Sequence, residues 1–76
     1  MTKKEEIAGL ILPLKTKLKV VYTELAALAE IAQMKASEER GDEAESLSWQ
    51  EQHIHYACRE IENAVFDLDI ALKEAL

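Results

Sequence analysis

Three side chains in the second half of the chain have the types and the spacing of metal ligands. Glu51, His55 and Cys58 are four and three residues apart, so a helix would place them on neighbouring turns. A carboxylate, an imidazole and a thiolate can bind a transition metal, but this mixed trio matches no standard ligand pattern. The simpler interpretation is an ion pair between His55 and Glu51 beside a cysteine that packs as a small apolar residue. We therefore predict no metal site and no cofactor.

Other arrangements that support catalysis are missing from the sequence. His53 and His55 are two residues apart and would point to different faces of a helix, so they cannot share a metal. There are no Glu-x-x-His pairs of the kind that di-iron bundles use, and no glycine-rich phosphate loop. No His or Asp is placed to activate a particular serine. We predict that the protein is not an enzyme.

The strongest functional signal is a set of large apolar residues on one side of the second half. Trp49, Tyr56, Phe66 and Ile70 lie opposite the apolar seam of the helix expected there. Soluble monomers rarely expose a contiguous apolar stripe of this length, and Trp and Tyr often dominate the energetics of interfaces. We predict that these four residues bind a partner, either a second copy of the chain or a different protein. The alternative is a local packing role.

The first helix is predicted over residues 3–37. Thr2 and Glu5 have the spacing of a capping box, which begins a helix. Pro13 predicts a kink, because it cannot donate a hydrogen bond to the carbonyl of Gly9; a break after a short leading helix is the alternative. Apolar residues at spacings of four and three predict a seam, and further apolar residues beside it make the apolar arc wider than a two-helix contact needs. The seam residues are Ile7, Ile11, Leu14, Leu18, Val21, Leu25, Leu28 and Ala32.

A turn is predicted near residues 38–42, followed by a second helix over residues 43–75. Gly41 suits the left-handed residue that ends a helix, and Asp42 with Glu45 repeats the capping-box spacing. Ser48 with Glu51 is an alternative start. Alanines recur every seven residues on one flank of this helix, at positions 57, 64 and 71. Its seam residues are Leu47, Ile54, Cys58, Ile61, Val65, Leu68, Leu72 and Ala75.

Charge supports an antiparallel pairing of the two helices. Reversal near Gly41 brings the lysines at 15, 17 and 19 beside Glu62, Asp67 and Asp69. Each exposed pair is worth at most about 1 kcal/mol, so these pairs set the direction of packing and contribute little stability.

Composition limits the size and the partners of the protein. The 76 residues make one domain, residues 1–76, whose own core is marginal because a small chain buries only about 60% of its extended surface. The net charge of −6 makes nucleic acid an unfavourable partner, although residues 1–20 carry five lysines against two glutamates. A single cysteine excludes an internal disulfide, and no leader or membrane span is recognisable, so we expect a cytoplasmic protein without membrane contact.

Two known families share the two-helix plan. Lys15, Lys19 and Tyr22 lie near one side of the first helix, and with its lysine-rich start the chain resembles the plasmid RNA-binding protein Rop, an acidic dimer of helical hairpins. The stretch from Arg40 to Gln50 lies where a hairpin turn is expected, and in length and plan the chain is similar to the co-chaperones of type III secretion needle subunits. The first resemblance implies an RNA-binding dimer, and the second implies a subunit of a heteromeric complex. Neither resemblance transfers a functional residue.

Together these patterns predict an all-α fold. We expect a two-helix antiparallel hairpin, kinked near Pro13, that completes a four-helix bundle by pairing with a copy of itself. The expected function is that of a non-enzymatic adaptor, regulator or inhibitor that acts through helix-to-helix contacts, most simply as a homodimer. A heteromeric co-chaperone and an RNA-binding dimer are the alternatives. The expected core is Leu14, Leu18, Val21, Leu25, Ile54, Ile61, Val65 and Leu68.

Overall fold

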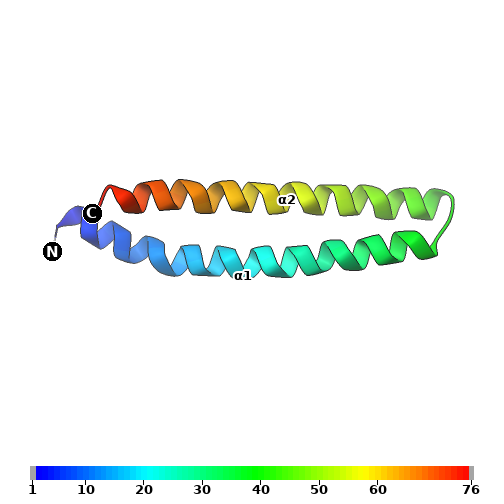
Figure 1. The fold of residues 1–76 in the computed structure, drawn as a ribbon, viewed down its shortest axis with the longest axis horizontal. Helices are drawn as coiled ribbons and strands as arrows, with labels where there is room; N and C mark the ends of the chain where they lie inside the picture. Colours follow the sequence, from blue (N-terminus) through cyan, green and yellow to red (C-terminus); the bar gives the residue numbers. More distant parts are fainter. Residues whose placement is uncertain (1, 76) are drawn as a thin grey trace.

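The protein folds as a hairpin of two long antiparallel helices. The computed structural model describes residues 2–75, in which α1 spans Lys3–Glu38 and α2 spans Asp42–Lys73. Figure 1 shows the helices side by side, with the first turns of α1 and the last turns of α2 at the same end. The predicted all-α hairpin is confirmed, and its predicted bounds differ by at most two residues. Neither helix contains an apolar stretch that would reach across a bilayer.

Local side-chain and glycine chemistry sets the ends of the helices. The Thr2 hydroxyl accepts a hydrogen bond from the Glu5 amide at 3.2 Å, as the capping box predicts. At the turn, Glu39 is extended and caps the end of α1. Gly41 has the predicted left-handed φ, at 70°, but the prediction that it ends the first helix is wrong, because it stands at the N-cap of α2 with ψ of −140°. Asp42 is accordingly the first residue of α2 and not its cap.

Pro13 lies inside α1 without ending it. The helix is continuous from Lys3 to Glu38, so the alternative of a broken first helix is wrong. In Figure 1 the blue N-terminal turns of α1 incline toward the last turns of α2, relative to the rest of α1. Proline removes one backbone hydrogen bond, and its ring crowds the carbonyl four residues earlier, at Gly9. Pro13 therefore accounts for the inclination of this part of α1.

The face of α2 that packs on α1 is the predicted seam. Cys58 is buried and 7% exposed, and the other members of the seam are half-buried. Glu51, which interrupts the seam, is half-buried as well. On the flank, Ala57 and Ala64 are half-buried and Ala71 is exposed.

The face of α1 that packs on α2 differs from the prediction. Four of the eight expected seam residues are half-buried or buried, namely Ile11, Leu18, Leu25 and Ala32. The other half is 40–56% exposed, and it consists of Ile7, Leu14, Val21 and Leu28. The prediction that Leu14 and Val21 belong to the core is therefore wrong. The contact with α2 is made instead by the residues that come one position later in the sequence, which are Ala8, Lys15, Tyr22 and Ala29.

Small side chains explain part of this rotation of α1. Ala29 and Ala32 are 2% and 8% exposed, and they are the only buried residues of α1. Alanines at facing positions let two helix axes approach closely, and close packing gains dispersion energy along the contact. A rotation that placed Leu28 at the contact would hold the helices further apart.

Polar contacts across the helix pair explain the rest of the rotation. Lys15 forms an ion pair with Asp69, which also confirms the antiparallel register in which this lysine meets an acid of α2. Tyr22 faces the carboxylate of Glu62. Both contacts require Lys15 and Tyr22 to be turned toward α2, so Leu14 and Val21 are turned away from it.

Candidate protein-interaction surface

The four residues predicted to bind a partner all lie on α2 and point away from α1. Trp49 and Phe66 are 62% and 63% exposed, and Tyr56 and Ile70 are 40% and 45% exposed. Trp49, Tyr56 and Ile70 are separated by multiples of seven residues and share one line along the helix, whereas Phe66 lies on the neighbouring line. All four are therefore open to solvent, as a role in partner binding requires.

Near the turn, rings and a guanidinium group form a continuous row along α2. Trp49 stacks on His53 with ring centroids 5.3 Å apart and an interplanar angle of 15°. His53 meets Tyr56 edge-on at 5.4 Å, and the Arg59 guanidinium carbon lies 5.9 Å from the centre of the Tyr56 ring. We call these four residues the aromatic ladder. It joins two of the predicted partner-binding residues, whereas Phe66 and Ile70 lie further along the helix.

Contacts within the aromatic ladder, and one from the neighbouring Gln52, hold its large side chains in place. Gln52 Nε2 donates a hydrogen bond to Tyr56 Oη at 2.6 Å. Ordered side chains lose less rotamer freedom on binding, and Trp, Tyr and Arg are the types that most often dominate interface energies. The sequence prediction omits His53, although its position four residues after Trp49 and three before Tyr56 is the signal that would identify it.

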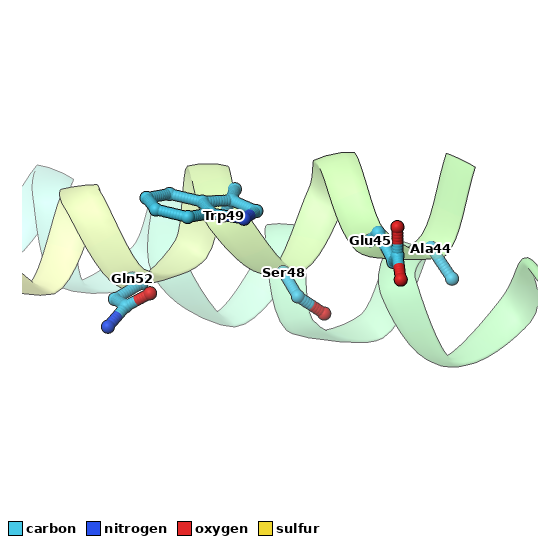
Figure 2. A pocket seen from close by; sticks show the side chains of 5 residues that line it. All are labelled: Ala44, Glu45, Ser48, Trp49 and Gln52. Carbon is cyan, nitrogen blue, oxygen red and sulfur yellow. The ribbon is translucent and has the colours of Figure 1, made fainter. Parts of the chain in front are cut away.

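A shallow groove runs along α2 beside Trp49. Figure 2 shows the Trp49 indole lying along the helix surface, with Gln52, Ser48 and Glu45 on consecutive turns. These residues and Ala44, which also lines the groove, all belong to α2. A groove formed by a single helix has no opposite wall and cannot enclose a small ligand. It suits the edge of a partner protein that packs beside the indole.

Two further grooves lie between the helices, on one side of the hairpin. The groove near the turn has a volume of about 500 Å³ and is lined by residues that include Leu28 and Gln50. The groove at the other end has a volume of about 320 Å³ and is lined by residues that include Ile7 and Ala71. Ile7 and Leu28 are three heptads apart on α1, and Gln50 and Ala71 are three heptads apart on α2, so both grooves open on the same side. We call this the apolar side.

The opposite side of the hairpin carries the polar contacts between the helices. Asp69, the partner of Lys15, is two residues from Ala71 and therefore about 200° around α2 from the apolar side. The Glu62 carboxylate raises the pKa of the Tyr22 phenol above its ordinary value of 10.0, first through a hydrogen bond and second through its charge. Two of the residues that suggest RNA binding, Lys15 and Tyr22, thus have partners within the hairpin.

The Tyr22→Phe variant should lose less stability at alkaline pH than the wild type does. Because folding raises the pKa of Tyr22, the contribution of its neutral phenol is fully present below the unfolded value and is lost as the pH rises through the folded value. Above about pH 10 the urea midpoint should fall more steeply for the wild type than for the variant. Glu62→Gln should remove the difference. Parallel curves for Tyr22→Phe and the wild type would contradict a phenol–carboxylate contact.

Of the three residues considered as metal ligands, His55 and Glu51 form a pair and Cys58 is a packed thiol. His55 Nε2 lies 3.5 Å from Glu51 Oε1, and Cys58 is a buried free cysteine. Within residues 2–75 no three His, Cys, Asp or Glu side chains converge as a metal-binding group.

In comparisons with known proteins, no protein-family model, curated protein or solved structure matches the chain.

Proposed function

We propose that the protein is a small non-enzymatic interaction module that acts through helix-to-helix contacts as a homodimer. The observation that carries this proposal is the shortage of core: among residues 2–75 only Ala29, Ala32 and Cys58 are buried, and no large side chain is fully buried. A scaffold this small usually needs an additional source of stability, and oligomerisation is one. Two hairpins that pack face to face form a four-helix bundle, in which exposed apolar residues of both copies become core.

The exposed apolar residues are numerous enough to drive association. Among the described residues, α1 exposes nine large apolar side chains and α2 exposes four. Full burial of one such side chain is worth about 1.5–3 kcal/mol. These side chains are 40–65% exposed, so burying what remains exposed gains about half of that value for each. Burying four or five of them on each copy therefore gains roughly 6–15 kcal/mol, which is of the same size as the roughly 4–15 kcal/mol that association costs in lost freedom.

A heteromeric role is the second candidate function, and the aromatic ladder favours it. Trp49 is 62% exposed yet is stacked on His53, and Phe66 adds a further exposed ring on the same helix. Exposed and ordered aromatic side chains are typical anchors for a different protein. In this role the hairpin is a subunit of a heteromeric complex, as a co-chaperone for a secretion needle subunit would be.

Sedimentation equilibrium tests the choice between the two functions. One chain has a mass of 8.6 kDa, and we expect a compact species of twice this mass at micromolar concentrations. Its thermal midpoint should rise with protein concentration, because pairing stabilises only the folded state. A species that keeps the mass of one chain and melts without cooperativity would contradict the homodimer and favour the heteromeric role.

A further inference from the structure

We infer that the second copy packs on the apolar side of the hairpin and not on the aromatic face of α2, by which we mean the face that carries Trp49, Tyr56, Phe66 and Ile70. This inference rests on the proposed homodimer and names the surface that it uses. Two lines of residues run along the apolar side. The ridge on α1 consists of Ile7, Leu14, Val21 and Leu28, and the alanine row on α2 consists of Ala57, Ala64 and Ala71.

The shapes of the two lines are complementary between copies. The ridge carries large side chains that are 40–56% exposed, whereas the alanine row carries methyl groups only. A two-fold rotation about an axis parallel to the helices places the ridge of each copy over the alanine row of the other. Both lines repeat every seven residues, so their side chains keep the same relative positions along the whole contact.

The register of the hairpin places each alanine of the row between two ridge residues in height, meaning position along the common direction of the helix axes. The Lys15–Asp69 ion pair and the groove shared by Ile7 and Ala71 fix the heights of the two helices relative to each other. Ala71 therefore lies at a height between Ile7 and Leu14, and the other alanines follow at the same interval. A rotation about an axis parallel to the helices preserves heights. Each ridge side chain of one copy then meets a gap between alanines of the other, as in knobs-into-holes packing.

Charges beside the two lines favour α1 packing on α2 of the other copy. The flank of α2 beside the alanine row is acidic at Glu60, Asp67 and Glu74. Packing α2 on α2 would bring these acids of the two copies together, whereas packing α1 on α2 brings Lys17 to the height of Asp67. Glu24 meets Glu60 in this arrangement and cancels that gain, so the advantage over packing α2 on α2 is that only one of the three acids meets another acid. Complementary charges at an interface mainly select the orientation of the partner.

The apolar side is large enough for a stable interface. The two longer dimensions of the hairpin are 59 and 14 Å, which define a face of the same order as the roughly 800 Å² that each partner buries in a standard complex. Packing on this side leaves the Lys15–Asp69 pair in solvent. It also leaves Trp49 and Phe66 on the outer surface of the dimer, whereas His53, which lines the groove near the turn, lies at the edge of the contact.

Charge substitutions on the two candidate faces test this assignment. Val21→Glu and Leu14→Glu should each weaken dimerisation by about 100-fold, because a carboxylate would be buried unpaired on the two-fold contact. Phe66→Glu, the matched control on the aromatic face, should change the dissociation constant by less than about 3-fold. Sedimentation equilibrium measures all three, and circular dichroism checks that each variant is helical. A dimer broken by Phe66→Glu and unaffected by the ridge variants would overturn the inference and leave the homodimer in place, whereas a monomeric wild type would refute the homodimer itself.

Spin labels at the turn test the orientation without adding a charge to either candidate face. Nitroxides on Arg40→Cys, in a Cys58→Ala background, should lie less than about 30 Å apart, because the parallel axis places both turns at the same end of the bundle and neighbouring helix axes are 8–10 Å apart. A ridge packed on a ridge would place the turns at opposite ends. A distance near the 59 Å length of the hairpin would therefore overturn the ridge-on-row arrangement.

Discussion

Ala29→Leu is expected to destabilise the hairpin by about 1–3 kcal/mol. Ala29 is 2% exposed on the face of α1 that packs on α2, so three added carbon atoms have no space without moving the helices apart. For a domain of 60–100 residues, each kcal/mol corresponds to about 4–8 °C in the thermal midpoint. Circular dichroism at 222 nm during heating measures the loss, at one fixed protein concentration, because the midpoint of a dimer depends on concentration.

Ala27→Leu provides the matched control for this substitution. Ala27 is exposed on α1, and Leu has nearly the same helix propensity as Ala, so the midpoint should change little. The pair thus separates packing at the helix contact from the chemistry of the substitution. Equal midpoints for Ala27→Leu and Ala29→Leu would show that α1 does not present Ala29 to α2 in solution.

The sequence predicts α2 better than α1, and the reason is the width of the apolar arc. On α2 the large aliphatic residues of the seam lie on two adjacent lines that form one face, and this face packs on α1 as predicted. On α1 apolar residues occupy several neighbouring lines, and periodicity does not decide which of them meets α2. The decision depends on Ala29 and on the Lys15–Asp69 contact, which are properties of the pair of helices. No property of α1 alone reveals them.

The incorrect prediction for α1 has a physical meaning of its own. Ile7, Leu14, Val21 and Leu28 have the spacing of a helical seam, yet the hairpin leaves them exposed. A seam that its own chain does not cover has the pattern expected for contact with another helix. The ridge therefore links the sequence pattern to the proposed homodimer.

The positions of the candidate partner-binding residues could be predicted from the sequence, but the contacts between their side chains could not. Trp49, Tyr56, Phe66 and Ile70 follow from their place opposite the seam of α2, and all four are exposed. The stacking of His53 between Trp49 and Tyr56 depends on side-chain rotamers, which spacing alone does not specify. Spacing shows only that these rings are neighbours.

Gly41→Ala is expected to destabilise the hairpin by about 1–3 kcal/mol, because its backbone conformation is one that L residues rarely adopt. Gly41 has φ of 70° and ψ of −140° at the N-cap of α2. An added Cβ would meet nothing within 4 Å, so the cost arises from the backbone and not from a clash. Urea unfolding followed by circular dichroism measures the change in the free energy of unfolding.

Gly9→Ala makes the same chemical change inside α1 and should have the opposite sign. Gly9 is exposed and helical, and an added Cβ meets nothing within 4 Å, so the variant should gain about 1 kcal/mol from helix propensity. Both substitutions remove the same freedom from the unfolded chain, so the difference between them isolates the backbone strain at the turn. If Gly41→Ala also stabilised the protein, the turn in solution would differ from the one described.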